Sequence, residues 1–101
     1  MSVLVVMKVS GDTATFRKAM AERTDELEAS AARAKDAGAI HHRFGIGDGF
    51  VQVIDEWENG EQFQKFFGDP KMQEFVASLG ADTSNPPEIT ITEAIASPDE
   101  F

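Results

Sequence analysis

Residues 40–57 read IHHRFGIGDGFVQVIDEW, and this stretch decides the fold. It holds two runs rich in β-forming residues, 40–47 and 50–57, on either side of Asp48-Gly49. An Asp-Gly dipeptide between such runs favours the two-residue type I′ turn of a β-hairpin. Because side chains alternate between the two faces of a strand, a turn of this length also sets which residues lie opposite one another.

The register that a two-residue turn predicts matches apolar side chains with apolar partners. A turn one residue longer would pair Phe44 with Gln52 and His42 with Ile54, which mixes polar and apolar partners. We therefore predict the shorter turn. The pairs that it places on one face are Ile46 with Val51, Phe44 with Val53, His42 with Asp55, and Ile40 with Trp57.

A strand and a long helix precede the hairpin. Residues 3–9 are apolar on both faces of a strand, so both faces need to be covered. Asp12 can cap the helix that follows, and Gly38 can end it because glycine accepts the left-handed conformation. At helical spacing the inward stripe of this helix is Phe16, Met20, Arg23 or Thr24, Leu27, Ala31 and Ala34.

A second helical region and a last strand follow the hairpin. Asn59 caps the helix with Gln62 as its capping-box partner, and the helix restarts at Asp69-Pro70 because proline suits a first helical position. After a polar loop at 81–87, residues 88–96 alternate apolar side chains with threonine and predict a strand before a short acidic tail. The apolar side chains of the helical region are Phe63, Phe66, Phe67, Met72, Phe75, Val76 and Leu79.

The predicted order of elements is strand, helix, strand, strand, helix, strand. This is the split βαβ order of a ferredoxin-like α+β fold, in which a four-stranded antiparallel sheet carries both helices on one face. No linker or repeat divides the chain, so residues 1–101 are predicted to form one domain. The first and last strands offer apolar side chains to both sheet faces, which predicts that the helix-free face packs against a second copy in a homodimer.

The composition restricts the partners that this chain is expected to have. Hydrophobic residues make up 42% and charged residues 27% of the chain, which is typical of a globular domain and too polar for a membrane span. A formal charge of -9 repels phosphate backbones and anionic lipids, so we expect no nucleic acid and no membrane as partner. Cysteine is absent and the opening apolar run lacks the marks of a signal peptide, which favours a cytoplasmic location.

The stretch Val53-Ile54-Asp55-Glu56-Trp57-Glu58-Asn59, which leads into a Phe-rich helix and Asp69-Pro70, resembles the dimeric α+β barrel superfamily. More narrowly, the chain is similar to the antibiotic biosynthesis monooxygenase-like proteins. The resemblance implies two sheets packed across a dimer and, in each protomer, a pocket between sheet and helices. In that pocket some members oxidise aromatic polyketides or quinols without a cofactor, whereas others bind and degrade haem.

The residues that carry activity in these relatives are only partly present here. The resemblance implies that cofactor-free members use an Asn, a Trp and tyrosines in the pocket. In this chain only the Trp is present, as Trp57. The chain has no tyrosine, and the residue behind Trp57 on the strand is Val53 and not an Asn. Haem-degrading members carry an Asn on the first strand and a haem-ligating His on the second helix. Here residues 3–9 contain no Asn and residues 60–79 contain no His, so we predict no haem binding of that kind.

The candidate site residues are His42, Asp55 and Trp57, because the register puts them on one face and the resemblance implies that helices cover this face. A carboxylate opposite an imidazole holds the ring in one tautomer and raises its basicity, which suits a general base. We assign His42 as base, Asp55 as its orienting partner and Trp57 as a ring that stacks on substrate. The alternative is that His42 and Asp55 are a structural pair that satisfies only each other's hydrogen bonding, and that Trp57 is a core residue. The candidate ligand-binding phenylalanines, or plain core residues, are Phe44, Phe63 and Phe67.

No metal site and no cofactor are predicted from the sequence. His41 and His42 are neighbours on a strand, so their side chains point to opposite faces and cannot chelate one ion. The leading interpretation is a monooxygenase-like enzyme that acts without a cofactor on a small apolar or aromatic molecule. The alternative is a non-catalytic homodimer that binds a ligand or has a structural role.

Overall fold

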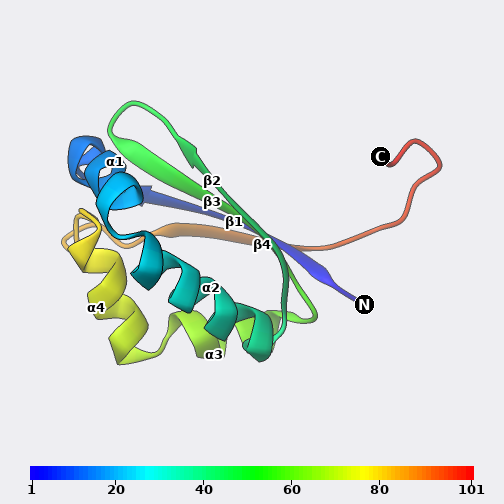
Figure 1. Cartoon of the computed structure of the whole chain (residues 1–101). Coiled ribbons are helices and arrows are strands. Elements are labelled where there is room, and N and C mark those ends of the chain that lie inside the picture. Colours follow the sequence, from blue (N-terminus) through cyan, green and yellow to red (C-terminus); the bar gives the residue numbers. More distant parts are fainter.

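The computed structural model, which describes residues 1–101, has its helices on one face of a four-stranded antiparallel sheet (Figure 1). The elements are β1 (Val3–Ser10), α1 (Thr13–Glu22), α2 (Thr24–Ala37), β2 (Ala39–Ile46), β3 (Phe50–Trp57), α3 (Gly60–Phe67), α4 (Pro70–Ser78) and β4 (Glu88–Glu93). The sheet order is β2-β3-β1-β4. This confirms the predicted ferredoxin-like α+β fold, although both predicted helical regions are divided in two. None of the helices has the length and hydrophobicity that a membrane-spanning segment needs.

The hairpin has the predicted two-residue loop and register over most of its length. His42 lies opposite Asp55, and the apolar pairs nearer the turn are also as predicted. The N–H of Gly47 donates to the Phe50 carbonyl at 2.9 Å across the turn. The predicted turn type is wrong, because a type I′ turn needs positive φ at both central residues and only Gly49, with φ 81°, has it.

A β-bulge changes the pairing at the open end of the hairpin. The register shifts between Ala39 and His41, so Ile40 is an extra residue and Trp57 lies opposite Ala39. The predicted pair of Ile40 with Trp57 is therefore wrong. Next to the bulge, the Glu58 N–H donates to the Gly38 carbonyl at 2.9 Å, which joins the end of β3 to the residue between α2 and β2.

The first predicted helix is broken at Arg23, which separates α1 from α2. Arg23 has φ −116° and ψ 39°, outside the helical range. Its guanidinium donates to the Ser78 carbonyl at 3.3 Å and to Ser78 Oγ at 3.0 Å, which ties the break to the end of α4. The predicted ends are confirmed, because the Asp12 carboxylate accepts from N–H groups of the first turn and Gly38 ends α2 with φ 121°.

The second helical region starts and restarts where predicted. Asn59 Oδ1 accepts the Gln62 N–H at 2.9 Å, and Asp69 accepts the Lys71 N–H at 2.8 Å at the restart. The predicted capping box is incomplete, because the Gln62 side chain donates to Glu58 at 3.3 Å and not to the backbone of Asn59. Gln62 thus links α3 to the end of β3.

The last strand is shorter than predicted. β4 ends at Glu93, which pairs with Val3, the first residue of β1, so the strand pairing ends there. Ala94 still donates its N–H to the Ser2 carbonyl at 3.0 Å. Ile95, predicted to lie in the strand, is 83% exposed beyond it.

Two buried clusters hold the helices to the sheet in separate places. The smaller cluster joins α1 to the end of α4 through Phe16, Ala19 and Leu79. The larger cluster packs α3 on the sheet through Val5, Met7, Val53, Trp57 and Phe63. Between the two clusters the helices stand off the sheet, which leaves a cavity.

The helix-free face of the sheet is partly apolar. Leu4 is 43% and Ile54 is 49% exposed, and half-buried Val6 lies directly opposite Ile54 and two residues after Leu4 on the same face. The expectation of apolar side chains from the last strand on this face is wrong, because Thr90 and Thr92 of β4 lie there opposite Val6 and Leu4. The apolar part of this face therefore comes from β1 and β3.

Candidate functional site

A cavity of about 530 Å³ lies between the sheet and the helices. Of its 32 lining residues, 21 are hydrophobic, and they come from the sheet and from all four helices. A largely apolar cavity of about 300–1,000 Å³ is typical of small-molecule sites. The residues predicted for the site all line it, namely His42, Asp55, Trp57, Phe44, Phe63 and Phe67.

Asp55 is the centre of a hydrogen-bonded chain of three side chains. Its Oδ1 lies 2.6 Å from His42 Nδ1, and its Oδ2 accepts the Trp57 Nε1–H at 3.1 Å. The β-pairing explains this grouping, because His42 is directly opposite Asp55 and Trp57 is two residues further along the same strand. Asp55 is 8% exposed, so these two partners replace the water that an exposed carboxylate would bind.

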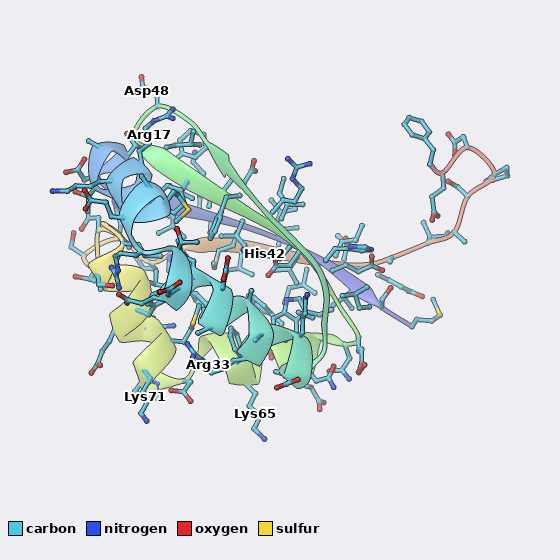
Figure 2. All side chains as sticks on the ribbon, viewed as in Figure 1. Arg17, Arg33, His42, Asp48, Lys65 and Lys71 are labelled. Atoms are coloured by element: carbon cyan, nitrogen blue, oxygen red, sulfur yellow. The ribbon has the colours of Figure 1, made fainter.

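The contact with Asp55 determines the tautomer of His42. An ionised carboxylate only accepts hydrogen bonds, so the Nδ1 that faces it carries the hydrogen. The free lone pair of the neutral ring is then on Nε2, which bonds to no other group of the chain. The His42 side chain is 41% exposed and lies between the sheet and α2 (Figure 2). The ring is thus arranged to accept a proton at Nε2, with a carboxylate to stabilise the resulting cation.

Trp57 is enclosed by other aromatic rings. It is 1% exposed, and its ring lies 5.7 Å from the ring of Phe63 and 5.5 Å from that of Phe66. Phe63 is 3% exposed and stacks on Phe67 at 5.8 Å. This geometry does not favour the predicted stacking of Trp57 on a substrate. The contact that Trp57 does make with the site is the hydrogen bond to Asp55.

Phe44 offers more open aromatic surface to the cavity than Trp57. It is 37% exposed, and its ring meets the Phe16 ring edge-on at 5.1 Å and the His42 ring at 4.6 Å. Phe44 therefore connects the core of α1 to the imidazole. A flat ligand next to His42 would contact this ring.

Ser30 is a cavity residue that sequence reasoning missed. It is 8% exposed on α2, with its Oγ 3.9 Å from Met72 Sδ. Its place three residues after Leu27 and four before Ala34 continues the apolar stripe of the helix, and this spacing is the signal that could have found it. A hydroxyl in a mostly apolar wall gives a ligand a group to hydrogen-bond.

His41 lies on the opposite face of the sheet from His42. It pairs with Glu56, its Nε2 is 4.0 Å from Glu56 Oε1, and its side chain is 76% exposed. The prediction that the two histidines point to opposite faces is confirmed. His41 is therefore a matched control for experiments on His42, because it has the same side chain on the same strand.

The fold is the one found in solved structures that are described as antibiotic biosynthesis monooxygenases or as a monooxygenase. No protein-family model matches the sequence, and no curated protein matches it either. The structural matches span nearly the whole chain at identities below 20%, so the likeness establishes the fold and not an activity.

Three of these structures illustrate the match. The monooxygenase ActVA-Orf6 of Streptomyces coelicolor, solved with the ligand nanaomycin D, has a TM-score of 0.64 and 18% identity, covering 95% of this chain and 89% of that one. SnoaB, a cofactor-independent oxygenase from Streptomyces nogalater, has a TM-score of 0.58 and 17% identity, covering 98% of each chain. A candidate antibiotic biosynthesis monooxygenase from Deinococcus radiodurans has a TM-score of 0.64 and 13% identity, again covering 98% of each chain.

Proposed function

We propose that this chain is a cofactor-independent oxygenase that acts on a small hydroxylated aromatic molecule in the cavity. The observation that carries the proposal is the imidazole of His42, whose Nδ1 is held by buried Asp55 at 2.6 Å while Nε2 is free beside the cavity. The largely apolar walls suit an aromatic ligand. Two proteins with this fold are named as a monooxygenase and a cofactor-independent oxygenase, which supports the same reaction class.

In the proposed reaction, Nε2 of His42 takes the proton of a phenolic or enolic hydroxyl, and Asp55 stabilises the imidazolium. The substrate anion is electron-rich and is itself the reductant of molecular oxygen. At a CH₂ group between aromatic rings, one oxygen atom becomes a carbonyl and the other leaves as water with the two hydrogens of that group. The imidazolium returns its proton to the substrate oxygen from which it came, which restores the hydroxyl, so the step balances with molecular oxygen alone and needs no cofactor.

A substrate screen followed by paired variants tests this proposal. Oxygen consumption would be measured with quinols, anthrones and similar aromatics. We expect His42→Ala to lower turnover about 10²- to 10⁴-fold, the usual effect of losing a positioned general base. His41→Ala, on the opposite sheet face, keeps the contact of His42 with Asp55 and should lower turnover far less than His42→Ala does. Turnover that survives both His42→Ala and Asp55→Asn would show that these residues are structural.

A non-catalytic role in ligand binding is the second candidate function. The observations that favour it are the lack of any tyrosine in the chain and the enclosure of Trp57 at 1% exposure. In this case an aromatic ligand should change the fluorescence of Trp57 without any oxygen being consumed. Oxygen consumption by the wild-type chain, lost in His42→Ala, would exclude this reading.

We also infer that residues 1–101 act as one domain of a homodimer that joins two helix-free sheet faces. Leu4 and Ile54 would otherwise leave large apolar side chains exposed on a small domain. Ile54→Glu should yield monomers in sedimentation equilibrium at micromolar concentration while the fluorescence of Trp57 stays native. A wild-type chain that sediments as a monomer would contradict the inference.

A further inference from the structure

The Ser30 hydroxyl is a buried polar group for which the chain supplies only a weak partner. Ser30 is 8% exposed on α2. A serine inside a helix can point to solvent or bond to the carbonyl four residues earlier. The hydroxyl of Ser30 does neither, because its one hydrogen bond is to Met72 Sδ at 3.9 Å, and a thioether sulfur is a weak acceptor. Buried polar groups in native proteins are normally well bonded, so this hydroxyl is free to take a better acceptor from a ligand.

Ser30 faces the cavity at the point between the two buried clusters. Three residues earlier, Leu27 packs against the smaller cluster, and four residues later, Ala34 packs against the larger one. Residues at this spacing share one face of a helix, so Ser30 lies on the inward face where the helices stand off the sheet. His42 lines the same cavity from the sheet, with its ring between the sheet and α2 (Figure 2). The cavity therefore has a polar group on each of two facing walls, Nε2 of His42 on the sheet and the Ser30 hydroxyl on the helices.

The surroundings of Ser30 favour an uncharged acceptor oxygen over a carboxylate. The residues of α4 that line the cavity are all apolar, and Lys35 is the one cation of α2 that lines it. Lys35 is exposed and lies five residues after Ser30, which is about 140° around the helix. A carboxylate at Ser30 would therefore lose its hydration without gaining a cation from either helix. This costs far more than placing a carbonyl group there.

We propose that Ser30 determines specificity in this cavity, by donating its hydroxyl hydrogen to a carbonyl oxygen of a ligand whose phenolic hydroxyl bonds to Nε2 of His42. The ligand then spans the cavity from the sheet to the helices, and its ring lies against Phe44, which is 37% exposed. Apolar walls around about 530 Å³ would accept a flat molecule in many orientations, and two polar ends select one of them. The inference rests on the proposed binding of a hydroxylated aromatic molecule in the cavity, but not on the oxygenase chemistry.

Two ligands that differ only in a carbonyl group test the role of Ser30. 6-Hydroxytetralone and 6-hydroxytetralin share a ring skeleton and a phenolic hydroxyl, and only the tetralone has a carbonyl. Their dissociation constants would be measured by calorimetry with the wild-type chain and with Ser30→Ala. We expect Ser30→Ala to weaken binding of the tetralone about three- to tenfold, the usual effect of losing one neutral hydrogen bond, and to change binding of the tetralin less than about twofold. The phenol of the tetralone is the more acidic one, but this difference is the same with both proteins and cancels in the comparison.

Two further variants separate recognition of the carbonyl from a purely structural role. Ser30→Thr keeps the hydroxyl and should keep the preference for the tetralone. Ser78 lies on α4 outside the cavity wall, and its hydroxyl donates to the Phe75 carbonyl at 2.6 Å, so Ser78→Ala should leave the ratio of the two dissociation constants unchanged. His42→Ala should weaken both ligands, because both carry the phenolic hydroxyl.

The outcomes for Ser30 and for the oxygenase can be told apart. An unchanged ratio of the two dissociation constants in Ser30→Ala, or a wild-type chain that binds neither ligand, overturns the role of Ser30. If His42→Ala removes the preference for the tetralone, the carbonyl is recognised at His42 and the proposal is also wrong. A preference that is lost in Ser30→Ala supports the proposal even if no aromatic substrate leads to oxygen consumption, a result that would refute the oxygenase alone.

Discussion

Replacing Asp55 with asparagine reverses one hydrogen bond while keeping the shape of the side chain. The Trp57 Nε1–H, which now donates at 3.1 Å, needs an acceptor, so the amide oxygen takes the place of Oδ2. The amide nitrogen then faces His42 Nδ1 and donates to it. The hydrogen of the ring moves to Nε2, which is the wrong tautomer for a base that acts through that atom.

The expected magnitudes follow from the same contacts. Asparagine keeps both hydrogen bonds, so the free energy of unfolding should fall by only about 1 kcal/mol. Asp55→Ala removes both and leaves the Nε1–H of Trp57, a residue 1% exposed, without an acceptor. Lost hydrogen bonds and an unsatisfied buried donor together should cost about 3 kcal/mol. Both variants should lower any turnover about 10²- to 10⁴-fold.

Two measurements check this reasoning. Urea unfolding followed by the fluorescence of Trp57, the one tryptophan of the chain, gives the free energies. Nitrogen NMR of the two imidazoles gives the tautomers, with His41 as an internal reference. The reasoning is refuted if His42 keeps its hydrogen on Nδ1 in Asp55→Asn, or if asparagine costs as much stability as alanine.

Three further predictions concern stability, pH and haem. Gly38→Ala should lower the free energy of unfolding by about 1–3 kcal/mol, because φ is 121° and the new Cβ would lie 2.3 Å from Gln62 Oε1. Gly45→Ala, whose Cβ would make only an ordinary contact with Gln52 Cβ at 3.9 Å, should change it by less than about 1 kcal/mol. Hydrogen bonds from the Thr15 hydroxyl, and then from nearby backbone N–H groups, lower the pKa of Asp12 below its ordinary 3.8. The stability that the hydrogen bonds to the Asp12 carboxylate provide is complete above the ordinary pKa of 3.8 and is lost as the pH falls through the lowered pKa. The difference in unfolding free energy between wild type and Asp12→Asn should therefore shrink from pH 6 to pH 2, and a constant difference would contradict the assignment. Haem titration should leave the Soret band unshifted, because α3 and α4 carry no histidine, and a tight stoichiometric complex would show that another residue binds the iron.

The local features of the fold were predictable because their causes are adjacent in sequence. The hairpin register follows from a two-residue turn and from side-chain alternation, so the contact of His42 with Asp55 was predicted before any tertiary contact was known. The helix start at Asp12 and the restart at Asp69 were predictable for the same reason, since each cap bonds to its own first turn. The candidate acid-base pair thus needed only the hairpin.

Features that depend on distant partners were not predictable in this way. The break at Arg23 became visible only with its contact to Ser78, which is 55 residues away. The bulge at Ile40 appears only in the pairing of β2 with β3, and the short last strand depends on where β1 begins. No sequence pattern within a few residues of these positions indicates which distant residues they contact.

The sequence by itself determined the order of strands and helical regions, the hairpin register from the turn to His42, and the face that carries His42, because caps, turns and alternation act between neighbours. The tertiary structure alone decided that the helices contact the sheet at two separate clusters and leave about 530 Å³ between them. It also decided that Trp57 is enclosed while Phe44 stays open to the cavity. The physical reason is that a cavity is space left over by packing, and its size depends on every long-range contact that positions a helix over the sheet.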